Sequence, residues 1–120
     1  MDNNIRGCYA EYLFGTECLK HNIIISYPLL DSSPYDCIVD TPNGLYKIQV
    51  KSSWQSEAKN RHTVSVNWNK SYSLNDVDFF AIYVKLYEGF FIFKNNGKRL
   101  CIRLNMKNDN SKYFNNFEFN

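Results

Sequence analysis

The sequence predicts a fold of the mixed α/β (α+β) class, in which an N-terminal helix precedes a mostly hairpin-connected β-sheet. Three observations support this prediction. Over residues 4–21, apolar side chains recur at three- and four-residue steps, which is the period of an amphipathic helix. Residues 41–44 read Thr-Pro-Asn-Gly, which is a strong hairpin-turn signal. Polarity alternates over residues 45–52, which is the period of a half-buried strand.

The other elements follow from shorter patterns. Residues 54–62 are polar and predict a loop, and residues 73–78 predict a short helix or turn. The tail from Asn105 combines polar residues with interleaved aromatics and predicts no regular element. Apolar or alternating runs predict further strands at residues 23–25, 35–40, 63–68, 79–86, 90–94 and 98–104.

Composition favours one globular domain over residues 1–120. Hydrophobic residues make up 44% of the chain and aromatic residues 17%, which argues against intrinsic disorder. No apolar run approaches the ~18–20 residues that span a bilayer, so we expect no membrane partner. The polar start, Met-Asp-Asn-Asn, shows no secretion signal, and we therefore expect a cytoplasmic protein.

The four cysteines give no sign of a metal site. They form no C-x-x-C pair and lie apart from the two histidines, which argues against zinc. Cys8, Cys37 and Cys101 fall within apolar patterns and are predicted to be small buried residues in a reducing cytosol. The absence of G-x-S-x-G and of a Gly-rich phosphate loop argues against a serine hydrolase and a P-loop enzyme.

The net charge of +2 does not by itself predict nucleic-acid binding, but the charge is unevenly distributed. A local basic stretch suits a surface that faces phosphates. An ordinary solvated loop is the alternative, and it is the simpler interpretation from charge alone. Only Glu57 opposes the basic residues of this stretch, which are Lys47, Lys51, Lys59, Arg61, His62 and Lys70.

The predicted hairpin brings chemically useful side chains together. Alternate residues of a strand share a face, so Gln49 and Lys51 point the same way. If the turn spans residues 41–44, Asp36 lies opposite Gln49; if it spans only 43–44, Asp36 lies opposite Lys51. In both registers a carboxylate, an amide and an ammonium converge on one patch. A simple cross-strand ion pair would give the same pattern.

Glu11 in the predicted helix adds a second carboxylate. Small side chains around it would let the helix approach the sheet closely, with Glu11 pointing at the patch. A carboxylate at the rim of the helix is the alternative. Its neighbours at three-, four- and seven-residue spacing are Gly7, Cys8, Gly15 and Cys18.

These residues, in their order and spacing, resemble the PD-(D/E)XK nuclease superfamily over residues 5–104. The resemblance lies in Gly7-x-x-x-Glu11, then Pro-Tyr-Asp ending at Asp36, then Ile-Gln-Val-Lys ending at Lys51. The Gln-x-Lys ending and the Tyr-Asp-x-Ile-Val-Asp strand are most similar to its group I intron homing endonuclease branch, which resembles archaeal Holliday junction resolvases in fold. The resemblance implies a restriction-endonuclease-like core, with the N-terminal helix packed on a central mixed sheet.

The resemblance also implies a metal-dependent DNA endonuclease that cuts duplex or branched DNA. Asp36, Glu11 and Gln49, with the backbone carbonyl of Val50, would ligate Mg²⁺ or Mn²⁺, and Lys51 would position or help to deprotonate the attacking water. Most of the superfamily has Asp or Glu where this chain has Gln49, and an amide brings no charge. We interpret Gln49 as a mark of the homing branch; a catalytically silent DNA-binding module with the same fold is the alternative.

Further contacts are expected around this site. We expect a two-fold homodimer, or a homotetramer built from two dimers, because a small domain reaches two DNA strands most easily in this way. An exposed sheet edge or the aromatic tail, residues 113–119, would supply the contact, unless the tail packs on its own core. A small β-rich interaction domain that binds no DNA remains a third hypothesis. The residues expected to contact DNA phosphates are Ser52, Ser53, Lys59, Arg61, His62 and Lys70.

Overall fold

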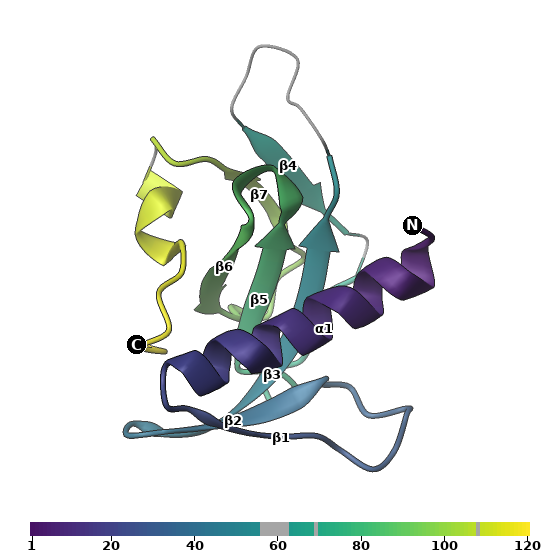
Figure 1. Cartoon of the computed structure of the whole chain (residues 1–120), viewed down its shortest axis with the longest axis vertical. Coiled ribbons are helices and arrows are strands. Elements are labelled where there is room, and N and C mark those ends of the chain that lie inside the picture. Colours follow the sequence, from purple (N-terminus) through teal and green to yellow (C-terminus); the bar gives the residue numbers. More distant parts are fainter. Residues whose placement is uncertain (56–62, 69, 108) are drawn as a thin grey trace.

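The computed structural model describes residues 1–55, 63–68, 70–107 and 109–120 (Figure 1). One α-helix precedes the strands, as the sequence predicts. The described elements are α1 (Asn3–Lys20), β1 (Ile24–Ser26), β2 (Cys37–Thr41), β3 (Gly44–Ser53), β4 (Val64–Asn67), β5 (Phe79–Val84), the 3₁₀ turn η1 (Lys85–Tyr87), β6 (Gly89–Lys94), β7 (Cys101–Leu104) and the 3₁₀ helix η2 (Asp109–Tyr113).

Helix α1 has a defined start and end. The Asp2 carboxylate accepts a hydrogen bond from the backbone N–H of Ile5 at 2.9 Å, which satisfies one of the free N–H groups of the first turn. Asn22 adopts a left-handed conformation, with φ of +59°, and turns the chain away from the helix. The helix lies across one face of the sheet, in front of β3 and β5 (Figure 1).

The main sheet is mixed, and its strand order is β1-β2-β3-β5-β6. The pairs β1–β2, β2–β3 and β5–β6 are antiparallel, whereas β3 and β5 run parallel. In the β2–β3 hairpin, the Thr41 hydroxyl donates to the Gly44 carbonyl at 2.9 Å, and Gly44 has a φ of +141° that favours glycine. β4 and β7 form a separate antiparallel pair.

The two halves of β3 have different neighbours. β2 pairs with β3 only from Gly44 to Ile48, and β5 pairs with it from Ile48 to Ser53. From Gln49 onward, no described strand pairs with the edge of β3 that β2 occupied. This open edge lies beneath the N-terminal half of α1.

Two hydrophobic clusters cover the two faces of the sheet. Phe14 of α1 packs with Ile48 and Val50 of β3 on one face. Phe80, Ile82 and their neighbours pack on the opposite face, where the β4–β7 pair lies. Phe117 and Phe119 of the tail belong to the first cluster. The tail therefore packs on the core of its own chain, which was one of the two alternatives.

Several predicted boundaries shift by a few residues. β5 ends at Val84, because the chain enters η1 and then turns at Glu88, whose φ is +50°. β7 begins only at Cys101, because the Asn95 and Asn96 side chains accept bonds from the two following turn residues. Residues 74–76 form a turn, which is one of the two alternatives predicted for residues 73–78. Most of the predicted loop at 54–62 lies outside the described residues.

The predicted burial of two cysteines is wrong. Cys37 is buried as expected, but Cys8 and Cys101 are exposed. Cys8 lies on the outer face of α1, away from the buried line that contains Phe14. Cys101 lies on the side of β7 opposite the buried Leu104. Within the described part of the chain, no helix combines the length and apolar character needed to cross a membrane.

Candidate active site

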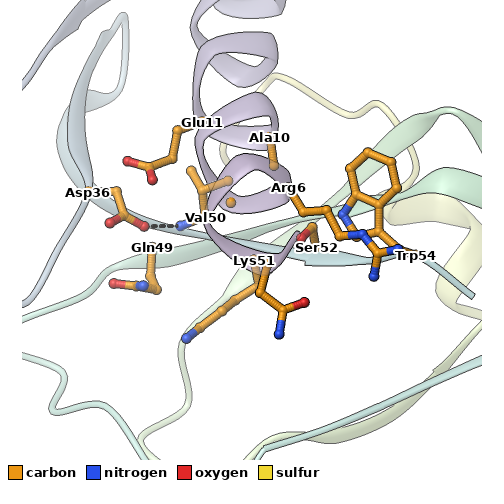
Figure 2. A pocket seen from close by; sticks show the side chains of 11 residues that line it. Arg6, Ala10, Glu11, Asp36, Gln49, Val50, Lys51, Ser52 and Trp54 are labelled. Carbon is orange, nitrogen blue, oxygen red and sulfur yellow. Dashed lines mark hydrogen bonds between the residues drawn. The ribbon is translucent and has the colours of Figure 1, made fainter. Parts of the chain in front are cut away.

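A cavity of about 430 Å³ lies between the N-terminal half of α1 and the open edge of β3 (Figure 2). Five α1 residues line one wall: Asn3, Arg6, Gly7, Ala10 and Glu11. The opposite wall contains Asp36, the β3 residues from Gln49 to Ser52, and Trp54. The cavity therefore contains the residues that the sequence singled out as catalytic: Glu11, Asp36, Gln49 and Lys51.

Asp36 lies where β2 stops pairing with β3. Its backbone N–H donates to the Ile48 carbonyl at 2.8 Å, and its carboxylate accepts from the Val50 N–H at 2.7 Å. If β2 extended further toward its N-terminus, a backbone carbonyl of β2 would accept the bond from the Val50 N–H. The Asp36 carboxylate takes the place of that carbonyl. The pairing of Cys37 with Ile48 agrees with the register in which Asp36 neighbours Gln49. The Asp36 carboxylate, however, lies at the edge of the sheet rather than on the face that was predicted.

Gln49 and Lys51 share a face, as predicted, and this face is opposite α1. Their partners in β5 are Phe80 and Ile82, which belong to the cluster on that side. The Lys51 Nζ lies 5.4 Å from the ring centre of Trp68 and 5.2 Å from that of Tyr72. Both distances permit cation–π attraction, which helps to hold the Lys51 side chain in place.

Glu11 approaches Asp36 from the helix side, and the two carboxylates affect each other. Figure 2 shows Glu11, Asp36, Gln49 and Lys51 following one another along one end of the cavity. Burial raises the pKa of Glu11, and the charge of Asp36 raises it further. Burial also raises the pKa of Asp36, while the Val50 N–H bond and the Lys51 charge oppose this rise. Two half-buried carboxylates that repel each other favour the binding of a cation.

The oxygen atoms at this end of the cavity fit a hard divalent cation. Glu11 and Asp36 offer carboxylates and Gln49 offers an amide oxygen. The Val50 carbonyl faces the same edge of β3 as the Val50 N–H, because both groups of a strand residue point to the same neighbour. No group of three or more His, Cys, Asp or Glu residues suited to a metal occurs among the described residues. A metal at this place would therefore rely on the amide and the carbonyl as well as on the two carboxylates.

The residues expected to contact DNA are only partly brought to this site. Ser52 lines the cavity, whereas Ser53 does not. Lys70 is exposed, and its Nζ lies 4.6 Å from the ring centre of Tyr72, the ring that Lys51 also approaches. Lys59, Arg61 and His62 lie outside the described residues.

Lys47 belongs to the predicted basic stretch but has a structural role. Its Nζ donates to the Asn75 carbonyl, and its backbone N–H donates to the Asp78 carboxylate at 2.8 Å. It therefore ties the start of β3 to the turn before β5.

Sequence reasoning missed Arg6 and did not place Trp54 among the site residues. Both line the end of the cavity away from Asp36 (Figure 2). The available signal was the helical period, because Arg6 and Ala10 are four residues apart and share the face that continues to Glu11. No comparable sequence signal placed Trp54 against α1.

A helix on a mixed sheet, with carboxylates, an amide and a lysine gathered at the open edge of a central strand, is an arrangement that can support metal-assisted cleavage of phosphodiesters. The comparisons agree. The whole chain, residues 1–120, matches the family described as PD-(D/E)XK endonuclease, and the chain belongs to this family. Nucleases of this family generally use divalent metal ions, and the family implies DNA as the substrate.

One solved structure similar to this chain is that of a bacterial homing endonuclease, I-Ssp6803I. The two are 26% identical, with a TM-score of 0.75 over 95% of this chain and 89% of the other. No curated protein matches this sequence. The family resemblance and the restriction-endonuclease-like fold inferred from the sequence are therefore confirmed.

Proposed function

We propose that residues 1–120 form one metal-dependent DNA endonuclease domain that hydrolyses phosphodiester bonds. The observation that carries this proposal is the grouping of two carboxylates, Glu11 and Asp36, with Gln49 and Lys51 in one cavity of a PD-(D/E)XK chain. The substrate class, duplex or branched DNA, is the one that the sequence resemblance implies, and the family match supports DNA as the substrate.

Four groups would hold Mg²⁺ or Mn²⁺ in this proposal: the Glu11 and Asp36 carboxylates, the Gln49 amide oxygen and the Val50 carbonyl. A bound divalent ion supplies a water of lowered pKa and neutralises charge on the phosphate. Asp36 is fixed for this task, because its second carboxylate oxygen is occupied by the Val50 N–H. Glu11 approaches from the helix, so the distance between α1 and β3 sets the size of the site.

Lys51 would act on the phosphate and on the attacking water. Its ammonium group places a positive charge next to the scissile phosphate, where negative charge develops in the transition state. Its positive charge also orients the attacking water and eases the loss of the water's proton to bulk solvent. The Trp68 and Tyr72 rings restrict the position of this side chain.

The experiment compares cleavage of supercoiled plasmid and of a labelled four-way junction, with Mg²⁺, with Mn²⁺ and with EDTA. We expect metal-dependent cutting that Lys51→Ala lowers by at least about 100-fold. Lys20→Ala, at the far end of α1, is the matched control for loss of one lysine charge and should cut normally. Cutting that persists in Lys51→Ala or in EDTA would show that these residues are not the active site.

Gln49 favours a second candidate, a DNA-binding module without activity, because the amide replaces a charged ligand. DNA binding without cutting, in both metals and on both substrates, would support it. In that case Gln49→Glu, which restores a third carboxylate, is the variant in which cutting should appear.

We also propose that the enzyme works as a homo-oligomer through the outer face of α1. With the tail packed in the core, this face carries exposed apolar side chains in a row: Ile5 (54% exposed), Tyr12 (71%) and Leu19 (63%). Their seven-residue spacing is typical of paired helices. A two-fold axis at Tyr12 would place Ile5 of one copy against Leu19 of the other.

Light scattering tests this contact. Tyr12→Glu should convert the oligomer to a smaller species, because it places two charges together at the axis. The control variant is Leu30→Glu, which places a charge at a leucine that is 72% exposed in the loop after β1 and should leave the oligomer intact. Dissociation by Leu30→Glu but not by Tyr12→Glu would show that the contact lies elsewhere.

A further inference from the structure

We propose that Arg6, held against the Trp54 ring, binds a DNA phosphate next to the phosphate that is cleaved. This inference rests on the proposed nuclease function and extends it. It gives a binding role to the end of the cavity that the proposed catalytic residues do not occupy. The ligand is recognised as a phosphodiester, through its charge and its acceptor oxygens.

The cavity has two ends of opposite character. Glu11 and Asp36 lie at one end, and Arg6 and Trp54 lie at the other (Figure 2). Along α1, Arg6 precedes Glu11 by five residues, which is a rise of about 7.5 Å. This separation is on the scale of neighbouring phosphates along one nucleic-acid strand. A strand that presents one phosphate to the acidic end through a metal would therefore bring another near Arg6.

Two hydrogen-bond donors at this end have no acceptor in the described chain. The Arg6 Nε and the Trp54 Nε1 are both buried and have no hydrogen-bond partner among the described residues. In Figure 2 the indole nitrogen lies on the side of the ring that faces Arg6. Buried donors are normally satisfied, and leaving one unpaired costs free energy. A phosphate offers only acceptors and carries charge, so it suits the Arg6 guanidinium, and a small shift of the Arg6 and Trp54 side chains would bring these two covered donors into contact with it.

Arg6 is also restrained in a way that suits this task. The carbon at the centre of its guanidinium group lies 5.3 Å from the centre of the Trp54 ring. The ring is itself held by Tyr9 and Tyr83, each 5.7 Å away between ring centres. Among the described residues, no carboxylate forms an ion pair with Arg6. A planar guanidinium held over an aromatic ring is well suited to phosphate recognition, since less of its freedom is lost on binding.

Gly7 gives an independent observation. It lies within α1 and lines the same cavity, yet a Cβ added there would meet no atom within 4 Å. No packing inside the chain therefore requires a glycine, although glycine is a poor helix former. Close approach of a ligand to the helix backbone beside Arg6 accounts for it.

The experiment measures binding of labelled duplex and four-way junction DNA in EDTA, by fluorescence anisotropy, at several salt concentrations. Arg6→Gln keeps most of the side-chain stem but removes the charge, and Lys20→Gln removes a charge from the far end of the same helix. We expect Arg6→Gln to weaken binding roughly tenfold at low salt. The slope of log K against log [salt] should fall by about 0.9, the value for one phosphate contact. Lys20→Gln should match the wild type.

Two further measurements separate binding from packing. Arg6→Lys should keep the salt slope but lose part of the affinity, because it keeps the charge without the planar fork. Replacing single phosphates beside the cleaved one by neutral methylphosphonates should weaken wild-type binding at one position and leave Arg6→Gln unchanged there. A salt slope in Arg6→Gln equal to that of the wild type would overturn the phosphate site, while Lys51-dependent cutting would leave the proposed function intact. Wild-type protein that neither binds nor cuts DNA would overturn both.

Discussion

The two halves of helix α1 face the same sheet but contact it differently. In the second half, residues 12–20, Phe14 is fully buried and its ring lies 5.4 Å from that of Phe90. In the first half, residues 3–11, Arg6, Gly7 and Glu11 line a cavity instead. The difference teaches that one end of the helix is fixed by packing, so that the other end can present polar groups at a set distance from β3.

The two glycines of α1 show the same difference. A Cβ on Gly15 would lie 2.5 Å from the Tyr27 hydroxyl oxygen, so a neighbour within the chain explains this glycine. A Cβ on Gly7 would meet nothing. Substitutions in the second half should therefore act on stability, and substitutions in the first half on metal or DNA binding.

The largest expected effect is on stability, at Phe14. Phe14→Ala leaves a cavity beneath the second half of α1 and should lower the free energy of unfolding by about 3–5 kcal/mol. Urea unfolding followed by circular dichroism measures this change. A loss below about 1 kcal/mol would mean that this half of the helix does not fix α1 on the sheet.

Next in size is Glu11→Gln, which should lower cleavage by about 100-fold or more without loss of stability. Thermal unfolding of the same variant with and without Mg²⁺ gives a second measurement. Mg²⁺ should raise the Tm of the wild type and have a much smaller effect on Glu11→Gln, because one carboxylate ligand is missing. A large loss of stability in Glu11→Gln would mean that Glu11 contributes to packing. That result would contradict the difference between the two halves of α1.

The pH dependence of stability sharpens this prediction. Burial, and then Asp36, raise the pKa of Glu11 above its ordinary value. The folded state therefore holds this proton more tightly than the unfolded state. The stability that the protonated form contributes is complete below the ordinary pKa and is lost as pH rises through the raised pKa. In EDTA, the Tm of Glu11→Gln relative to the wild type should increase as the pH rises above the ordinary glutamate pKa of 4.5.

The smallest expected effect is at Gly7. Gly7→Ala should raise the free energy of unfolding by about 1 kcal/mol, because alanine favours the helix and the added Cβ meets nothing. The same variant should bind DNA several-fold more weakly, since the methyl group enters the cavity. Gly15→Ala is the matched control and should gain less stability, because Tyr27 must move. Normal DNA affinity in Gly7→Ala would show that no ligand passes close to this turn.

Local patterns predicted the parts of the fold that depend on neighbours in sequence. The helical period of residues 4–21 correctly placed Glu11 on a helix, which is α1. The turn at residues 41–44 correctly placed Gln49 on the second strand of a hairpin, which is β3. The face shared by Gln49 and Lys51 was also correct, because alternation along a strand is a local property.

The parts that depend on distant segments could not be predicted. The parallel pairing of β3 with β5 joins residues that no turn connects. On the other side of β3, β2 stops pairing at Ile48 and leaves that edge open. That opening turns the Asp36 carboxylate to the sheet edge and creates the space that Arg6 and Trp54 line. Cys8 shows the same limit, because apolar neighbours in the sequence did not reveal which face of α1 meets the sheet.

The hydrogen bond from the Val50 N–H to the Asp36 carboxylate has a spectroscopic consequence. Amide protons that donate to a carboxylate change their chemical shift when the carboxylate gains a proton or a metal ion. In a ¹⁵N-labelled sample, the Val50 resonance is therefore a built-in reporter of the charge at the candidate metal site. It can be followed by titration without any DNA, and equally well in the Lys51→Ala variant that we expect to be inactive.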